Sequence, residues 1–293
     1  MPRGLRGRLH TLYEYCALYV GVATLGLLCL AFTPCAIVLS ALLPRRSAEA
    51  AGKWGITLGF RFYVRVLTLM RAFRVDLRAL DALRGEEALI IAPNHPGLID
   101  ALLVISRLPV NCIMKGEIER SFFLGAGARF AGYIGNASVH RMIHRSVASL
   151  REGAHLLVFP EGTRTTRSPV NAFTGSIAII ARHAKVPVQT VIIDTDSAYL
   201  SKGWPLLRKP TLPITYSMRL GRRFDPPVKP REFVEELERY FAGELAGGSM
   251  MDAWRPPSSA AAAAFVRSAS RHFPDNEGEP EPVQQPSCHH SEL

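Results

Sequence analysis

A long uncharged stretch near the N-terminus constrains the fold of this chain more than any other feature. The residues from Tyr15 to Pro44 include no Asp, Glu, Lys or Arg. About 20 apolar residues are enough for a helix to cross the hydrocarbon core of a bilayer, and this stretch is longer. A secretory signal peptide has a shorter apolar core and a small-residue cleavage site, so the stretch is predicted to be a retained membrane segment.

Two geometries of this segment are compatible with the sequence. One is a single tilted transmembrane helix, and the other is a helix that bends at Pro34, re-enters and never crosses. Basic residues flank the stretch on both sides: Arg3, Arg6 and Arg8 before it, and Arg45 and Arg46 after it. The positive-inside rule therefore gives no direction, and the symmetry favours the re-entrant form with both ends on the cytoplasmic face of the inner (plasma) membrane.

Residues 50–74 are predicted to form an interfacial helix. Trp54 is the expected anchor at the membrane surface, because its ring is apolar and carries one polar N–H. Five basic residues interrupt the apolar ones and would meet anionic headgroups: Lys53, Arg61, Arg65, Arg71 and Arg74. An ordinary domain helix with a solvated charged face is the alternative.

The composition separates lipid from nucleic acid as a partner. The formal net charge is +10 and 48% of the residues are hydrophobic, which favours an anionic lipid surface. No zinc finger, RNA-binding aromatic motif or basic-region helix supports nucleic acid. The 5 Cys residues show neither a disulfide framework nor metal-ligand spacing, as is typical of a reducing cytosol. We therefore expect no metal site.

After residue 75, short apolar runs alternate with segments of helical periodicity. The predicted strands are 88–92, 110–114, 132–136, 155–160, 186–194 and 214–220, and the predicted helices include 121–131, 142–152, 172–184 and 232–245. This alternation predicts an α/β fold, a mixed sheet flanked by helices, with an N-terminal membrane-embedded helical segment. We divide the chain into a membrane segment with its interfacial helix (1–74), an α/β domain (75–255), and a weak helix with a disordered tail (256–293).

A histidine and an aspartate lie in the turn after the strand 88–92. His95 follows the strand, and Asp100 falls in the first turn of the next helix. A carboxylate there is in reach of one imidazole nitrogen and fixes the tautomer, which leaves the other nitrogen to take a proton from a hydroxyl. The pair is a candidate catalytic dyad, although a helix N-cap beside a histidine gives the same spacing.

A second polar cluster follows the strand 155–160. It consists of Glu161, Gly162, Thr163 and Arg164, at the edge of an open α/β sheet where ligands bind. Arg164 suits a phosphate, because its planar fork engages two oxygens at once. Glu161 suits a sugar or glycerol hydroxyl.

Together these two stretches resemble a known family. Asn94-His95-x4-Asp100 and Phe159-Pro160-Glu161-Gly162-Thr163-Arg164 are similar to motifs of the glycerolipid acyltransferases, the 1-acylglycerol-3-phosphate acyltransferase group. The resemblance covers roughly residues 75–220. It implies that His95 deprotonates the acceptor hydroxyl, which attacks an acyl thioester directly, and that Asp100 orients His95. It also implies that residues 161–164 line the acceptor site.

Three positions depart from the family pattern. Gly97 occupies the place of a usual serine, and Thr190 occupies the place of a usual proline. The stretch 132–138 lacks the arginine that the family uses to hold the acceptor phosphate, and Arg141, three residues late, is its candidate substitute. These departures leave the chemistry in place and the identity of the acceptor open.

The resemblance implies a membrane-associated O-acyltransferase of phospholipid biosynthesis. It would move a fatty acyl group from acyl-CoA or acyl-ACP (acyl carrier protein) to lysophosphatidic acid, with the thioester carbonyl polarised by backbone amides or a positive group near the Gly97 turn. Lys115, at the end of the strand 110–114, is a further candidate for the acceptor phosphate, or else a surface lysine. No Gly-x-Ser-x-Gly elbow for an acyl-enzyme is present.

Two alternatives to lysophosphatidic acid acylation stay open. The first keeps the chemistry and uses another hydroxylated lipid acceptor, of the ornithine or aryl-polyene type. The second is an inactive membrane adaptor, against which the intact His95, Asp100 and Glu161 argue. The expected partners are the lipid bilayer, a lysophospholipid and the acyl donor, with no cofactor besides that co-substrate and no nucleic acid.

Overall fold

The computed structural model describes residues 3–246, except the side chains of residues 3–6 and 122–124. The predicted weak helix and disordered tail at 256–293 lie outside the described residues. The division of the chain at residues 74 and 255 stays a prediction.

A seven-stranded mixed sheet forms the centre of the fold, in the order β1-β7-β6-β2-β5-β3-β4. Its strands are β1 (Phe73–Asp76), β2 (Ile90–Pro93), β3 (Asn111–Met114), β4 (Ile134–Gly135), β5 (Leu156–Leu157), β6 (Val188–Thr195) and β7 (Ile214–Phe224). β6 and β7 are antiparallel, whereas β6, β2, β5, β3 and β4 all run parallel to one another. The ends of these five strands therefore share one edge of the sheet, called here the carboxyl edge. The predicted mixed sheet is confirmed.

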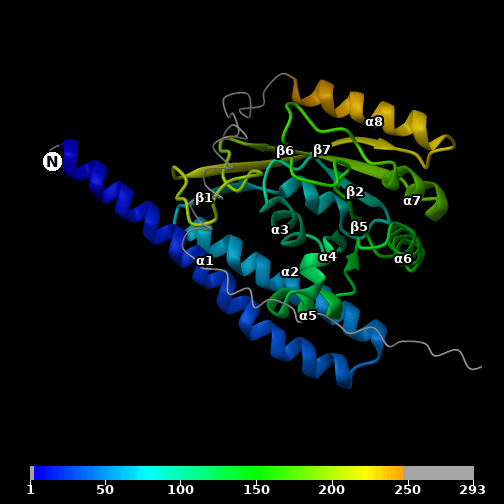
Figure 1. The fold of residues 1–293 in the computed structure, drawn as a ribbon, viewed down its shortest axis with the longest axis horizontal. Coiled ribbons are helices and arrows are strands. Elements are labelled where there is room, and N and C mark those ends of the chain that lie inside the picture. Colours follow the sequence, from blue (N-terminus) through cyan, green and yellow to red (C-terminus); the bar gives the residue numbers. More distant parts are fainter. Residues whose placement is uncertain (1–2, 247–293) are drawn as a thin grey trace, which may run out of the picture. The chain divides into compact units, whose positions relative to one another are not determined.

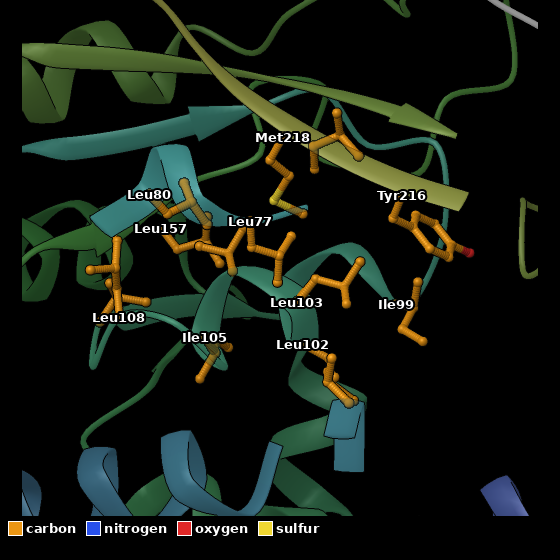
Figure 2. Close-up of a cluster of buried hydrophobic side chains, with 14 of the residues drawn as sticks. Leu77, Leu80, Ile99, Leu102, Leu103, Ile105, Leu108, Leu157, Tyr216 and Met218 are labelled. Atoms are coloured by element: carbon orange, nitrogen blue, oxygen red, sulfur yellow. The ribbon is translucent and has the colours of Figure 1, made fainter. Parts of the chain in front are cut away.

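Alternate residues of the central strands face opposite layers of helices, as the two-residue period of a strand requires. Ile91 belongs to a cluster with α2 (Arg45–Leu69), the short helix η1 (Arg78–Leu83) and α3 (Asp100–Ile105), whereas Ile90 belongs to a cluster with α6 (Val139–Arg151), α7 (Ser176–Ala184) and α8 (Pro230–Leu245). Figure 2 shows part of the first cluster, with Leu80, Leu103 and Met218 drawn from η1, α3 and β7. Figure 1 shows α2 and α8 on opposite sides of the sheet.

Most predicted helices are present, and one starts later than expected. The helix predicted at 232–245 is α8, which buries Phe233, Leu237 and Phe241 along one side. The helix predicted at 172–184 begins only at Ser176. Before this start the N–H groups of residues 171, 173 and 174 donate to Glu161, to Glu238 and to the Pro160 carbonyl. These bonds hold the segment 171–174 against other parts of the chain, outside the helix.

Of the two geometries considered for the apolar segment, the helix that re-enters at Pro34 does not match the structure, because the helix is not interrupted there. The helix α1 (Arg3–Leu42) continues through Pro34, the chain reverses only after Leu42, and α2 runs back along α1 (Figure 1). Packing explains this, because the Phe32 ring lies against Gly55 of α2 and Gly127 of α5 (Phe122–Phe130), where it holds α1 in place. Among the described residues, α1 supplies the one stretch long and apolar enough to cross a membrane, Gly7–Leu42.

Candidate active site

The end of β2 at the carboxyl edge is fixed by a side chain. Asn94 is 5% exposed, and its amide exchanges two hydrogen bonds with the backbone of Ile193 on β6, at 2.9 and 2.7 Å. These bonds continue the pairing of β2 with β6 for one residue beyond the strand. The next residue, His95, therefore leaves the sheet from a defined position.

His95 and Asp100 are brought together as the spacing predicted. His95 Nδ1 lies 2.9 Å from Asp100 Oδ2, and the Asp100 side chain is fully buried. The same oxygen accepts the Gly97 N–H at 2.7 Å. Burial raises the pKa of Asp100, while the hydrogen bonds from His95 and Gly97 oppose that rise. With Nδ1 directed at the carboxylate, Nε2 is the nitrogen available to a substrate.

The His95 ring is also held from one side. It stacks on Phe159, with ring centroids 3.8 Å apart and planes 21° from parallel. The side chain keeps 14% exposure. A ring fixed by one stacking contact and one hydrogen bond has little rotational freedom, which suits a group that must meet a proton in one direction.

Glu161 supports the backbone of the His95 turn. Its carboxylate accepts the His95 N–H at 3.0 Å, the Thr165 hydroxyl at 2.7 Å and the Asn171 N–H at 2.9 Å. The residue is 4% exposed, and burial raises the pKa of the Glu161 carboxyl while these bonds lower it. The geometry favours a positioning role for Glu161. The predicted contact with an acceptor hydroxyl stays a prediction.

Arg164 lies beside the dyad and is half-buried. Its Nη1 donates to the carbonyls of Leu200 and Ser201, at 2.9 and 3.0 Å. Burial lowers the pKa of Arg164, and the nearby Asp100 carboxylate raises it. The contacts of Nη1 orient the guanidinium, whose other N–H groups have no hydrogen-bond acceptor in the described part of the chain.

Glycine is required at two positions of the site for different physical reasons. Gly162 has φ +65°, a left-handed conformation that L side chains rarely adopt, and it lets the chain turn directly after Glu161. At Gly97 the limit is space, because a Cβ atom would lie 3.2 Å from the Tyr199 carbonyl oxygen. The segment 199–201 thus occupies the place that a family serine would need. Thr163 is half-buried between Gly162 and Arg164.

Backbone amides near Gly97 are already engaged. The Gly97 N–H donates to Asp100, and the Leu98 N–H donates to the Leu200 carbonyl at 3.0 Å. We expected either backbone amides or a positive group near Gly97 to polarise the thioester carbonyl. The Gly97 and Leu98 amides already have acceptors within the protein. Arg164 is the positive group that remains close.

Lys115 and Arg141 lie at the carboxyl edge without a contact to the dyad. Lys115 follows β3 and precedes α4 (Gly116–Arg120), and Arg141 lies in the first turn of α6, after β4. Both side chains are exposed, and within residues 3–246 neither forms an ion pair. The structure thus brings His95, Asp100, Glu161 and Arg164 together, and leaves Lys115 and Arg141 at the edge of that group. No cluster of His, Cys, Asp or Glu suited to a metal occurs among the described side chains.

The comparison with protein families agrees with this arrangement. Residues 74–194 match the family model described as Acyltransferase. The chain carries an acyltransferase domain. The matched range includes the dyad and residues 161–164, so the resemblance inferred from those motifs is confirmed.

The names of curated relatives of the acyltransferase domain refer to more than one kind of lipid. The human 1-acyl-sn-glycerol-3-phosphate acyltransferase beta is 23% identical over 191 residues, which are 62% of this chain and 66% of that protein. The lyso-ornithine lipid O-acyltransferase of Pseudomonas aeruginosa is 30% identical over 121 residues, which are 40% of this chain and 45% of that protein. The chain thus spans about half of the length of the curated relatives it matches.

One solved structure shares the fold. The 1-acyl-sn-glycerophosphate acyltransferase PlsC from Thermotoga maritima has a TM-score of 0.52 to this chain at 22% identity. The alignment covers 84% of this chain and 98% of that one. The likeness therefore extends beyond the acyltransferase domain.

Sequence patterns missed several residues that build the site. The sequence could have indicated Asn94, because a polar side chain directly after a buried strand can bond the backbone of the neighbouring strand. It indicates Thr165 more weakly, only because this residue directly follows the second motif. It does not indicate Asn171 and Leu200, because their contacts with Glu161 and Arg164 join segments 10 and 36 residues apart.

Proposed function

We propose that this protein is a membrane-bound O-acyltransferase that transfers a fatty acyl group from acyl-CoA or acyl-ACP to lysophosphatidic acid. The observation that carries the proposal is the His95–Asp100 pair, with Nδ1 bound to a buried carboxylate and Nε2 available. This pair lies inside the matched acyltransferase domain.

The proposed reaction needs one base and no covalent intermediate. His95 Nε2 takes the proton of the acceptor hydroxyl, and the oxygen attacks the thioester carbonyl carbon. The new C–O bond forms, the C–S bond breaks, and the imidazolium returns the proton to the departing thiolate. Asp100 stabilises the imidazolium while it exists, because the two groups are 2.9 Å apart in a buried site.

Arg164 is proposed to stabilise the negative charge of the substrates in this reaction. Its guanidinium is oriented by the carbonyls of Leu200 and Ser201 and lies near Asp100. It is the positive group next to a turn whose Gly97 and Leu98 amides are engaged. The free N–H groups of Arg164 are proposed to bind the acceptor phosphate or the carbonyl oxygen of the thioester. Lys115 and Arg141 would then meet the headgroup from the carboxyl edge.

The helices α1 and α2 are proposed to hold the enzyme on the membrane. In the most apolar window of α1 only 11% of residues are buried in the protein. On α2, Trp54, Leu58 and Phe62 recur every four residues and are more than half exposed. Such a stripe suits the boundary of headgroups and acyl chains, where a lysolipid acceptor resides. We place the domain on the cytoplasmic face, where acyl-CoA and acyl-ACP occur.

A lyso-ornithine lipid is the second candidate acceptor. The relative with that activity in its name has 30% identity to this chain, against 23% for the human relative. In addition, the stretch 132–138 lacks the phosphate-binding arginine of the family pattern. Ornithine is an amino acid, so its lipid offers an amine where lysophosphatidic acid offers a phosphate.

An acceptor panel tests the proposal. The full chain, purified in dodecyl maltoside, receives labelled lysophosphatidic acid or lyso-ornithine lipid, each with acyl-CoA and with acyl-ACP. Phosphatidic acid as the main product, absent with His95→Ala, supports the first candidate. Acylation of the lyso-ornithine lipid alone selects the second. No product from either acceptor with either donor contradicts both.

A further inference from the structure

A large basic cavity lies at the edge of the sheet opposite to His95. Its volume is about 1190 Å³, and it is lined by α2, by α6 and by residues at the starts of strands. Asn111 and Ile134 begin β3 and β4, and Ala154 precedes β5. Because these strands are parallel to β2, their starts lie at the edge remote from the His95 turn. The cavity is therefore separate from the acyltransferase site.

The charges in this cavity are unbalanced. Two carboxylates, Glu49 and Glu152, line it against His144 and five basic side chains, Arg45, Arg46, Lys53, Arg145 and Arg151. The ion pair of Arg45 and Glu49, at 2.8 Å, engages one cation and one carboxylate. Arg46, Lys53 and Arg145 have no ion-pair partner within the described residues. Several cations facing one hollow repel each other unless an anion joins them.

Two buried groups make this more than a solvated basic surface. Lys53 is partly buried, and burial lowers its pKa, an effect that the carboxylates of Glu49 and Glu152 partly oppose. Asn111 lines the same cavity at 4% exposure, its Nδ2 donates to Ser149 Oγ, and its Oδ1 has no partner among the described atoms. Since a hydroxyl donates as well as accepts, turning the amide over keeps the Ser149 bond and frees two N–H donors.

We propose that this cavity binds a phosphate-bearing anion at a site distinct from the acyl-transfer centre. Arginine forks and a lysine ammonium are the groups that recognise phosphate oxygens, and here they come from two helices that face each other across the cavity. Bound phosphate would join α2 to α6. Because α6 begins beside Arg141 at the carboxyl edge, this site lies at the other end of a helix that reaches the acceptor region.

The phosphate has two chemical sources, a lipid headgroup and a soluble phosphorylated compound. Arg45 and Arg46 directly follow the turn at the end of the apolar helix α1, where Leu42 is 72% exposed. Cations at the end of an apolar helix lie at headgroup level. That position makes an anionic headgroup accessible, whereas the volume also admits a soluble anion.

Hydrogen exchange of the full chain locates the ligand and separates the sources. One arm adds inorganic pyrophosphate to the protein in dodecyl maltoside, without lipid. The other places the protein in phosphatidylcholine nanodiscs with or without phosphatidylglycerol. The readout is the exchange of peptides covering residues 45–53 and 139–152. Slower exchange in both peptides is expected in at least one arm. Slower exchange with pyrophosphate only indicates a soluble ligand. Slower exchange with phosphatidylglycerol only indicates a lipid headgroup.

Matched variants decide whether the cavity is responsible. Lys53→Gln/Arg145→Gln removes two lining cations and is expected to raise the ligand concentration needed for protection about tenfold or more. Arg182→Gln/Arg239→Gln removes two exposed cations of α7 and α8 and is expected to leave it unchanged. Arg46→Gln, at an exposed position, repeats the test should the double variant misfold. Absence of protection in both arms, or equal protection in the cavity variants and the wild type, overturns the proposal.

Discussion

The carboxylate of Glu161 accepts the backbone N–H of His95 at 3.0 Å, across 66 positions of sequence. The bond is completed by a return contact, in which the Thr165 N–H donates to the His95 carbonyl at 2.8 Å. The segment after β5 therefore holds both backbone polar groups of His95. The first motif supplies the imidazole, and the second fixes the peptide that carries it.

Glu161→Gln is expected to lower kcat while the KM of the acceptor changes less. A glutamine presents an amide N–H₂ to at least one of the three donors, so the His95 turn loses a support. Misplacement of a catalytic group by about 1 Å costs up to about 10²-fold in rate. The loss of a buried acceptor lowers the free energy of unfolding by about 1–3 kcal/mol.

The pH dependence of stability tests whether the buried carboxyl of Glu161 itself is responsible for the effect of Glu161→Gln. Burial raises the native pKa of Glu161 above its usual value of 4.5. In the window above pH 4.5 the unfolded chain has lost this proton while the native protein keeps it. The stabilisation tied to Glu161 is therefore complete below that pH and decreases as the pH rises through the native pKa. The stability difference between wild type and Glu161→Gln, from urea unfolding at several pH values, should shrink with rising pH. A difference that grows with pH would refute this assignment, and exposed Glu87→Gln is the control.

Gly97→Ser is expected to reduce both stability and activity. The new Cβ atom would lie 3.2 Å from the Tyr199 carbonyl oxygen, so the segment 199–201 must move by a few tenths of an ångström. Overpacking of this kind costs about 1 kcal/mol or more. Gly243→Ser on α8, where a Cβ meets nothing within 4 Å, is the matched control. A Gly97→Ser protein with wild-type Tm and kcat/KM would show that the segment 199–201 does not constrain the turn.

Arg164→Lys is expected to raise the KM of the acceptor about tenfold, with kcat reduced less. Lysine keeps the charge, but its single ammonium group cannot bind two backbone carbonyls and also present a planar fork to a ligand. Steady-state kinetics with varied acceptor measures the effect, and Arg208→Lys in the exposed loop serves as control. A fall in kcat with KM unchanged would instead place Arg164 at the thioester carbonyl.

Leu103→Ala is expected to lower the free energy of unfolding by about 3 kcal/mol. Leu103 is fully buried in the cluster of Figure 2, between the sheet and α2, and belongs to the helix that carries Asp100. Leu206→Ala, at a 58% exposed position, should change stability by less than about 0.5 kcal/mol. Urea unfolding compares the two. Equal effects would mean that this cluster does not support the α3 side of the sheet.

The sequence predicted those parts of the fold that depend on local pattern. The residues Phe233, Leu237 and Phe241 recur at helical spacing, and they do lie in the helix α8. His95 and Asp100 are five residues apart, so their contact depends on one turn and one helix start. The alternation of strands and helices was enough to predict a mixed sheet, because each element has its own hydrophobic period.

Features that depend on distant packing were not predictable in this way. The helix α1 continues past Pro34, and its Phe32 ring packs against Gly55 and Gly127, a contact that no local pattern reveals.

The three donors to the Glu161 carboxylate, from His95, Thr165 and Asn171, lie 66, 4 and 10 residues away from it in the sequence. Glu161 was interpreted as a group for an acceptor hydroxyl from its residue type, its place after a strand and the family resemblance. That contact stays a prediction, whereas the three donors to its carboxylate could not be read from the sequence.

Acyl transfer by His95→Ala tests the central claim most directly. The full chain in dodecyl maltoside is assayed with the best acceptor and donor of the panel, beside His140→Ala, which removes an exposed histidine of α6. The account predicts that His95→Ala loses about 10²–10⁴-fold in kcat while it remains folded, and that His140→Ala keeps wild-type activity. A folded His95→Ala protein with wild-type kcat would contradict the assignment of His95 as the base.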